Sequence, residues 1–259
     1  MIVGILQARA SSRRLPGKVL KPILGRPMLE RQIERLRRAR RMDRLVVATS
    51  DNPTDDGIDR LCESLATDCF RGSLEDVLDR FYQAARRHRA RTVVRLTGDC
   101  PLADPSIIDR LIGLHEATGD DYTSNTVTRT YPDGLDAEVV EFDCLHTAWR
   151  EAVLPSEREH VTPFIYHRPE RFRLGNLRQD EDMSHLRWAV DELQDFAFVS
   201  AIYEALYPDD PAFTTADVLA LLERRPDIAT MMGNAATNEG YRRSLAADAA
   251  ILAASKGKD

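Results

Sequence analysis

Residues 2–18, IVGILQARASSRRLPGK, join an apolar run to a basic loop and decide the class of fold. Ile2 to Leu6 is apolar and rich in β-branched residues, without the alternation of a half-exposed strand. Such a run is typical of a strand buried on both faces of a parallel sheet. The loop that follows it lies where α/β proteins usually bind ligands, outside the carboxyl ends of the strands.

Strand-like and helix-like segments alternate through the next hundred residues. Apolar runs at 45–48 and 92–96 predict two more buried strands. Apolar residues at helical spacing predict a helix that begins near Pro27 and further helices over 55–65, 76–88 and 105–114. This alternation predicts a layered α/β fold with a mainly parallel sheet.

The pattern changes near residue 123. Residues 123–142 are polar and β-branched around a Pro-Asp-Gly turn, and they predict an inserted antiparallel hairpin or arm. Beyond it we predict helices over 158–167, 195–206, 215–224 and 241–254, and strands over 172–177 and 186–190. We expect one α/β domain over residues 1–225 and a helical extension over 226–259.

Composition and charge limit the classes of function. A net charge of −6 disfavours non-specific binding to nucleic acid, which needs surplus Lys and Arg. The four cysteines form no CxxC pair, so we expect free thiols in a reducing compartment. The N-terminal apolar run is short and precedes the basic residues, unlike a signal peptide, and no run is long enough to span a membrane. We expect a cytoplasmic protein that binds neither nucleic acid nor membrane.

The basic loop has the chemistry of a phosphate site. Residues 8–18 offer three arginines, a lysine and two serines directly after the first predicted strand. Phosphates need positive charge and closely approaching backbone N–H groups. The loop matches neither the P-loop nor the dinucleotide-binding pattern. A basic run is more often a solvated surface, but its position after a buried strand favours phosphate binding.

Two aspartates are candidate ligands of Mg²⁺. Asp99 follows the strand predicted at 92–96, between a glycine and a turn-forming proline, and it could equally cap the next helix. Asp191 follows the apolar run at 186–190 and could also be a helix N-cap, a role that suits Asp195 better. Mg²⁺ needs only one or two carboxylates, because it keeps waters and binds substrate phosphates.

Polar residues in and after the predicted arm are candidates for binding an acceptor. Asn125, Asp133, Asp136 and Glu138 could bind hydroxyl groups, and Arg158 and His160 could hold a carboxylate or phosphate. The alternatives are that the arm is surface structure and that His160 is an ordinary hydrogen-bonded histidine at a helix start.

The order Ala-Arg, Ser, Arg-Leu-Pro-Gly-Lys within residues 8–18 resembles the signature of the 3-deoxy-manno-octulosonate cytidylyltransferases. It is also similar to spore-coat polysaccharide biosynthesis cytidylyltransferase-like proteins, which residues 131–138 and 158–163 resemble more closely. The resemblance implies a three-layer Rossmann-like nucleotidyltransferase fold with the inserted β-arm, and a homodimer. It implies that the nucleotide contacts Ala8, Arg9, Ser12, Arg14 and Lys18.

The same resemblance extends to three more residues. The Gly-Asp-x-Pro and Val-Asp-x-x-x-Asp elements match at Asp99 and Asp191, which implies that both hold Mg²⁺. Residues 70–80 resemble the family's base-recognition segment, which implies that Arg80 reads the pyrimidine. The alternative for Arg80 is an exposed helix charge paired with Asp76.

The sequence therefore predicts a nucleotidyltransferase that moves CMP from CTP to a sugar acid or related acceptor, with release of pyrophosphate, in surface polysaccharide or activated-sugar synthesis. Lys18, Arg9 and Asp99 are the expected catalytic residues. One alternative is a glycosyltransferase that uses a nucleotide-sugar donor, although such enzymes usually hold the metal with an Asp-x-Asp pair that is absent near Asp99. Another is a regulator that binds nucleotide without turnover.

Overall fold

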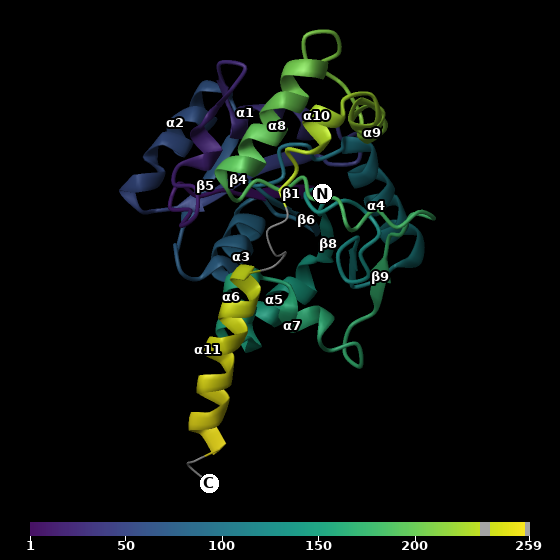
Figure 1. The fold of residues 1–259 in the computed structure, drawn as a ribbon. Coiled ribbons are helices and arrows are strands. Elements are labelled where there is room, and N and C mark those ends of the chain that lie inside the picture. Colours follow the sequence, from purple (N-terminus) through teal and green to yellow (C-terminus); the bar gives the residue numbers. More distant parts are fainter. Residues whose placement is uncertain (234–238, 257–259) are drawn as a thin grey trace.

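The three apolar runs of the N-terminal half form neighbouring parallel strands in the computed structural model, which describes residues 1–233 and 239–256 (Figure 1). The first strand lies inside the main sheet, between the strands formed by the second and third runs. In sheet order the strands are β5 (Asp68–Gly72), β4 (Arg44–Ser50), β1 (Ile2–Gln7), β6 (Thr92–Thr97), β8 (Glu138–Glu141), β7 (Tyr122–Ser124) and β9 (Leu174–Asn176). A separate two-stranded sheet joins β2 (Pro22–Ile23) and β3 (Arg26–Pro27).

The polar segment after residue 122 forms the predicted antiparallel hairpin, but it does so within the main sheet. Its strands β7 and β8 pair with each other, and β8 also pairs antiparallel with β6. Among the described strands of the main sheet, β8 alone runs against the others. The sheet is therefore mainly parallel, as expected, and residues 125–137 form the loop between the two hairpin strands.

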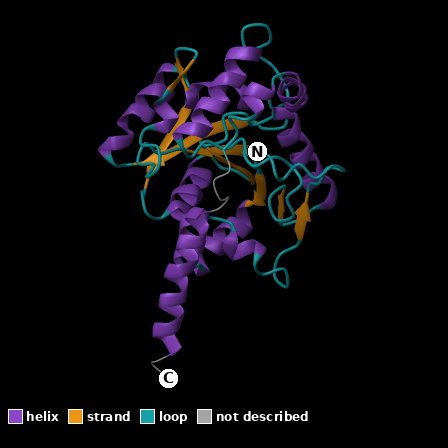
Figure 2. Ribbon diagram, in the orientation of Figure 1, coloured by secondary structure: helices purple, strands orange, loops and turns teal. Residues whose placement is uncertain are grey.

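Helices cover both faces of the sheet, so the fold has three layers (Figure 2). One face packs against α1 (Met28–Leu36), α2 (Asp56–Ser64), α4 (Pro105–Thr118), α8 (Leu193–Leu206) and α9 (Thr215–Arg224). The other packs against α3 (Val77–Arg87), α5 (Phe142–Glu151) and α7 (Pro163–Tyr166). Neighbouring residues of a strand point to opposite faces of the sheet. Val94 packs in the core on the side of α1 and α4, and Val93 packs in the core on the side of α3 and α5. The apolar runs lack alternation because both faces are buried.

Several segments differ from the prediction. The helix predicted over 158–167 is two short helices, α6 (Pro155–His160) and α7, separated at Val161, whose φ of 73° is incompatible with a right-handed helix. The strand predicted over 186–190 is wrong, because that segment is extended and forms a single bridge between Arg187 and Asp133. Helix α8 starts two residues early, with Glu192 as N-cap and Asp195 in its first turn.

The C-terminal segment contains α10 (Pro226–Ala229) and α11 (Glu239–Lys256). The helix predicted over 241–254 is thus confirmed, and it packs on α6 and extends away from the sheet (Figure 1). The boundary at residue 225 stays a prediction, and positions 234–238 and 257–259 of the extension fall outside the described residues. Two short 3-10 helices, η1 (Lys18–Leu20) and η2 (Pro53–Asp55), complete the fold.

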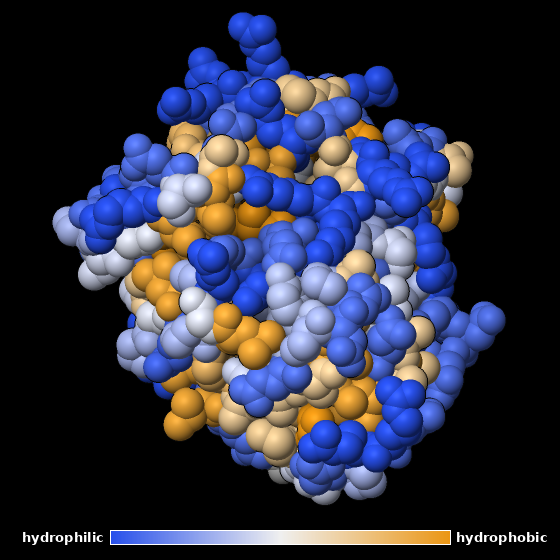
Figure 3. All heavy atoms as spheres, turned by 90° about the horizontal axis from the view of Figure 1, so that it is seen from above, coloured by the Kyte–Doolittle hydropathy of each residue, from blue (hydrophilic) through white to orange (hydrophobic). Residues whose placement is uncertain are grey.

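The surface is mixed in character. Figure 3, which views the molecule from above, shows hydrophilic and hydrophobic residues interspersed over this face. Within the described part of the chain, no helix has both the length and the apolar character to cross a membrane.

Candidate nucleotide site

The chain order of the strands places a cavity at the carboxyl ends of β1 and β6. The chain runs from β1 outward through β4 to β5 and then returns to the other side of β1 as β6, so the strand order reverses between β1 and β6. Open α/β sheets bind ligands at such a reversal. A cavity of about 620 Å³ lies here, lined by residues of the loop after β1 and by Gly98 and Asp99 after β6. Its volume is in the range of ordinary ligand pockets.

Lys18 lines this cavity. It is the first residue of η1 and is buried, with 8% of its surface exposed. Its Nζ donates to the carbonyl of Val190 at 2.6 Å and to Oδ1 of Asp191 at 3.1 Å, and it lies 3.8 Å from Oδ2 of Asp99. A single ammonium group therefore stands between the two predicted metal carboxylates.

A backbone hydrogen bond holds the segments of these carboxylates together. Val190 N donates to Asp99 O at 2.8 Å, which ties the extended segment before α8 to the loop after β6. Burial alone would raise the pKa of Asp191, but the charge of Lys18 and the hydrogen bond from Arg187 outweigh it and hold that pKa below its usual value. Asp191 is thus ionised at neutral pH.

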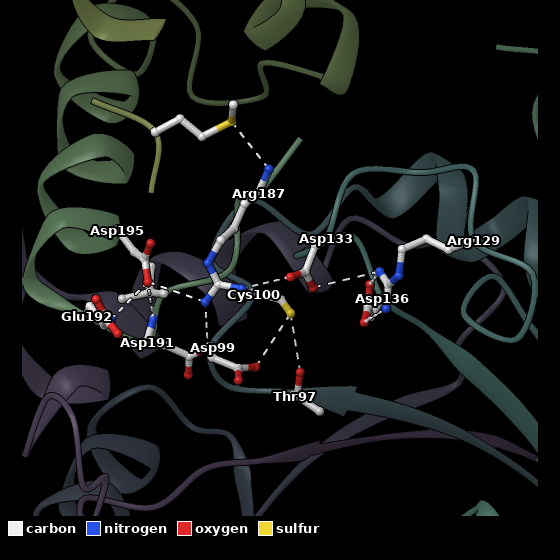
Figure 4. A network of polar contacts seen from close by, with 12 residues as sticks. Thr97, Asp99, Cys100, Arg129, Asp133, Asp136, Arg187, Asp191, Glu192 and Asp195 are labelled. Carbon is white, nitrogen blue, oxygen red and sulfur yellow. Dashed lines mark hydrogen bonds and ion pairs between the residues drawn. The ribbon is translucent and has the colours of Figure 1, made fainter. Parts of the chain in front are cut away.

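Arg187 is a residue of this site that the sequence analysis missed (Figure 4). Its Nη2 lies 2.7 Å from Oδ2 of Asp191 and 3.4 Å from Oδ2 of Asp195, while its Nη1 donates to Asp133 at 2.9 Å. Burial, and then the charge of Asp136, raise the pKa of Asp133 to about 6. Arg187 therefore orders the carboxylates on one side of the cavity. In the sequence, only the four-residue spacing from Arg187 to Asp191 could have indicated this ion pair, and outside a helix that spacing is weak evidence.

The loop after β1 brings its predicted phosphate contacts to the cavity. Ala8, Arg9, Ser12 and Arg14 all line it, as does Arg13, which the resemblance left out. Arg14 Nη2 lies 2.9 Å from Oδ2 of Asp191. In the part of the chain that the structure describes, Arg9 has no carboxylate within ion-pair distance. The charge of Arg9 is therefore available to a ligand.

The loop after β1 is fixed by a carboxylate beneath it. Asp55 is fully buried, and its Oδ1 accepts from Ala10 N at 2.7 Å. Its Oδ2 accepts from Ser50 N at 3.1 Å. The end of β4 thus anchors the loop, and nothing in the sequence pattern singled out Asp55 for this role.

Arg80 is buried in the cavity wall and is not an exposed helix charge. It lies on α3 with 1% of its surface exposed, and its Nη1 donates to the carbonyl of Ser73 at 2.6 Å. Its Nε has no hydrogen-bond partner within the described residues. Burial, and then the charge of Arg9, lower its pKa to about 10. The alternative pairing with Asp76 is also excluded, because that carboxylate pairs with Arg158.

Two of the predicted acceptor contacts lie away from the cavity. Asn125 is buried and joins the two sides of the loop between β7 and β8: its Nδ2 donates to Leu135 O at 2.8 Å, and its Oδ1 accepts from Ala137 N at 2.9 Å. Arg158 ties α6 to α3 by pairing with Asp76, and it donates to Trp149 O at 2.7 Å. Neither residue lines the cavity and both side chains make hydrogen bonds within the fold, so the acceptor assignments for Asn125 and Arg158 stay predictions without support from this geometry.

The other acceptor candidates line the cavity with partners of their own. Asp136 forms a bidentate pair with Arg129, with Nη2 to Oδ2 at 2.8 Å. Glu138 pairs with Arg95 and accepts from Tyr122 OH at 2.7 Å and from the hydroxyl of Thr162.

His160 is neutral at physiological pH. Burial, and then the charge of Arg95, lower its pKa to about 4. Its Nε2 lies 3.1 Å from Ser244 Oγ on α11. A histidine in this state offers hydrogen bonds to an acceptor but no positive charge.

Comparison with known proteins identifies similar sequences. A family model described as "Cytidylyltransferase" matches residues 3–215. An uncharacterized protein of Methanocaldococcus jannaschii is 40% identical over 75% of this chain and 80% of its own length. Spore coat polysaccharide biosynthesis protein SpsF of Bacillus subtilis is 35% identical over 88% of this chain and 97% of its own length.

Solved structures show the same fold. A cytidylyltransferase from Leptospira borgpetersenii superposes with a TM-score of 0.85 at 28% identity, covering 91% of this chain and 98% of that chain. A CMP:2-keto-3-deoxy-manno-octonic acid synthetase complexed with CTP superposes with a TM-score of 0.60, covering 79% of this chain and 98% of that chain. At 18% identity the latter supports a common fold alone.

Proposed function

The chain belongs to the cytidylyltransferase family, and from this premise we propose that it transfers CMP from CTP to a sugar acid or a related small acceptor. The observation that carries the proposal is the position of Lys18 between Asp99 and Asp191, beneath the arginine-bearing loop after β1. A triphosphate needs concentrated positive charge, and this cavity supplies it at the reversal of the strand order. The acceptor class and a role in surface polysaccharide or activated-sugar synthesis belong to this proposal.

The reaction that we propose is an in-line displacement at the α-phosphorus. An oxygen of the acceptor forms the new P–O bond, with loss of its proton to solvent where it is a hydroxyl oxygen, while the bond from the α-phosphorus to the α,β-bridging oxygen breaks. Pyrophosphate leaves with the bridging oxygen. Lys18, Arg9 and Arg14 bind the phosphates and offset the charge that develops on the leaving group.

The donor set fits Mg²⁺ in this proposal. No cluster of three or more His, Cys, Asp or Glu able to hold a metal ion occurs within residues 1–233 and 239–256. Two carboxylates suffice for Mg²⁺, which takes its other ligands from water and phosphate. Asp99 and Asp191 would hold the ion, because both carboxylates lie within 4 Å of the Lys18 ammonium and therefore face a common point. Bound there, Mg²⁺ would neutralise phosphate charge and orient the triphosphate.

Arg80 is the proposed reader of the base. It lines the cavity on α3, it is buried, and its Nε lacks a partner among the described residues. An unpaired buried donor gains most from an acceptor atom on a ligand. The O2 and N3 atoms of cytosine are such acceptors, and this supports the choice of a pyrimidine. A homodimer and a cytoplasmic location complete the proposal.

Pyrophosphate release tests this function. The full chain is incubated with Mg²⁺ and each of the four nucleoside triphosphates, against a panel of sugar acids, sugar phosphates and phosphonates. We expect release with CTP and one acceptor class, abolished in Asp99→Asn and Asp191→Asn and kept in Asp180→Asn, whose carboxylate is exposed and lies outside the cavity. Equal release by Asp99→Asn and the wild type would contradict the assignment.

A further inference from the structure

Helix α11 lies outside the residues that match the cytidylyltransferase family, yet it borders the cavity. The match covers residues 3–215, whereas α11 runs from Glu239 to Lys256. Tyr241 and Arg243 of α11 line the same cavity as Lys18 and Asp99. This chain therefore has a cavity wall that the matched family domain does not supply.

Polar contacts at three turns fix α11 in place against α6 and α7. Tyr241 OH lies 2.7 Å from His167 Nε2. Ser244 Oγ, which is buried, donates to Glu159 Oε2 at 2.6 Å. Asp248, also buried, accepts from Ser156 N at 2.9 Å, in the first turn of α6. Positions 241, 244 and 248 share one face of a helix, so α11 is held in one rotation about its axis.

Tyr241 belongs to a group of rings on this wall. Its ring meets His160 edge-on, with 5.1 Å between centroids and an angle of 87°. A hydrogen bond with Tyr241, added to the effect of burial, raises the pKa of Tyr166 well above its usual value. His160 and Tyr166 also line the cavity, and α11 thus adds to the wall formed by α6 and α7.

Arg243 brings a positive charge that the fold itself does not use. Several cations of the cavity have carboxylate partners: Lys18 and Arg187 pair with Asp191, and Arg95 pairs with Glu138. Arg243 is exposed in the cavity lining and has no ion pair with any residue that the structure describes. His160, whose ring contacts Tyr241 of α11, is neutral at physiological pH, whereas Arg243 carries a positive charge on this wall.

We propose that α11 forms part of the acceptor site, and that Arg243 binds an anionic group of the acceptor, a carboxylate or a phosphate, beside Tyr241. The inference rests on the proposed function and adds to it the charge of the acceptor and the element that selects it. Guanidinium groups bind both anions through paired N–H donors. The triphosphate is assigned to the loop after β1, so Arg243 affects the acceptor and leaves CTP binding unchanged.

Calorimetry with the full chain tests this. The protein is first saturated with α,β-methylene CTP, a non-reacting analogue, in the presence of Mg²⁺. Binding is then measured for 3-deoxy-manno-octulosonate, a sugar carboxylate, for glucose 1-phosphate, a sugar phosphate, and for glucose, a neutral sugar. The variants are Arg243→Ala and, as a matched control, Arg242→Ala, which removes an exposed arginine outside the cavity lining.

We expect one of the two anionic sugars to bind and glucose not to bind. Arg243→Ala should weaken that binding about 10-fold or more, as expected for loss of a charge-assisted hydrogen bond, and Arg242→Ala should not. Three results would overturn the inference: no binding of either anion, equal binding in the two variants, or a loss of affinity for the CTP analogue in Arg243→Ala. Failure of the wild type to bind the analogue would instead count against the proposed function.

Discussion

The ammonium group of Lys18 lies 3.1 Å from Oδ1 of Asp191, although the two residues are 173 positions apart in the chain. The contact joins the loop after β1 to the segment before α8, two parts of the chain that local sequence patterns treat independently. It places a buried cation and a carboxylate side by side in the lining of the cavity.

Replacement of Lys18 by alanine should lower kcat by a factor on the order of 10² to 10³, because the charge that develops on the leaving phosphates loses its partner. The measurement is steady-state pyrophosphate release at saturating CTP, with circular dichroism to establish folding. Lys21→Ala is the control, since Lys21 lies in the same segment but outside the cavity lining. A folded Lys18→Ala protein with wild-type kcat would show that Lys18 has no catalytic role.

Arg80→Lys should raise KM for CTP about 10-fold and reduce the preference for CTP over UTP. Lysine keeps the charge but cannot present the paired donors of a guanidinium group to a pyrimidine. The ratio of kcat/KM for the two nucleotides measures the effect. Arg86→Lys, on the exposed side of the same helix, should change neither value. An unchanged ratio in Arg80→Lys would remove Arg80 from base recognition.

The low pKa of His160 predicts a loss of stability in acid. A histidine has a pKa near 6.5 in the unfolded chain, and burial followed by the charge of Arg95 lowers it to about 4 in the folded protein. The contribution of neutral His160 to the free energy of unfolding is therefore complete above pH 6.5. It is lost as the pH falls from 6.5 to 4, because over this range the unfolded chain binds the proton and the folded protein does not.

Urea unfolding at pH 7 and pH 5 measures this contribution. From pH 7 to pH 5, the free energy of unfolding of the wild type should fall by about 2 kcal/mol more than that of His160→Gln. The control is His185→Gln, which alters an exposed histidine. Its free energy of unfolding should fall by as much as that of the wild type. Equal losses in His160→Gln and the wild type would show that His160 titrates normally in the folded protein.

Gly134→Ala should destabilise the protein where the loop between β7 and β8 packs against residues 188–189. Gly134 has a φ of 112°, and a Cβ atom there would lie 2.5 Å from Ala189 N and from the carbonyl carbon of Trp188. Gly119 is a control for backbone conformation alone, since its φ is 64° and an added Cβ would meet nothing within 4 Å. In thermal unfolding, the free energy of unfolding should fall by about 1 kcal/mol in Gly119→Ala and by clearly more in Gly134→Ala.

Much of the fold follows from local patterns in the sequence. The runs at 2–6, 45–48 and 92–96 are buried on both faces, so they lack alternation, and each forms a strand of the parallel sheet. The helices between them carry apolar residues at helical spacing. The loop over residues 8–18 follows a buried strand directly, and this is why its place at a ligand-binding edge could be predicted.

The remaining features depend on contacts between distant segments. Residues 186–190 have the composition of a strand, but they pair with a loop through Asp133 and with Asp99 O, not with a neighbouring strand. Arg187 acts through Asp133, 54 positions away, and no local pattern indicates that pairing. Asn125 and Arg158 have the residue types of acceptor contacts, but their groups are used within the fold. The sequence predicted a helix at 241–254 without indicating that it borders the cavity.

The most direct test of cytidylyl transfer is ³¹P NMR of the full chain with CTP, Mg²⁺ and the acceptor that supports turnover. We predict that the α-phosphorus of CTP appears in a new linkage to the acceptor, a phosphodiester at a hydroxyl group or an anhydride at a phosphate or phosphonate, in equal amount with free pyrophosphate, and that neither product appears in Asp99→Asn. Formation of CDP with inorganic phosphate, or turnover of a nucleotide-sugar donor in place of CTP, would contradict the account.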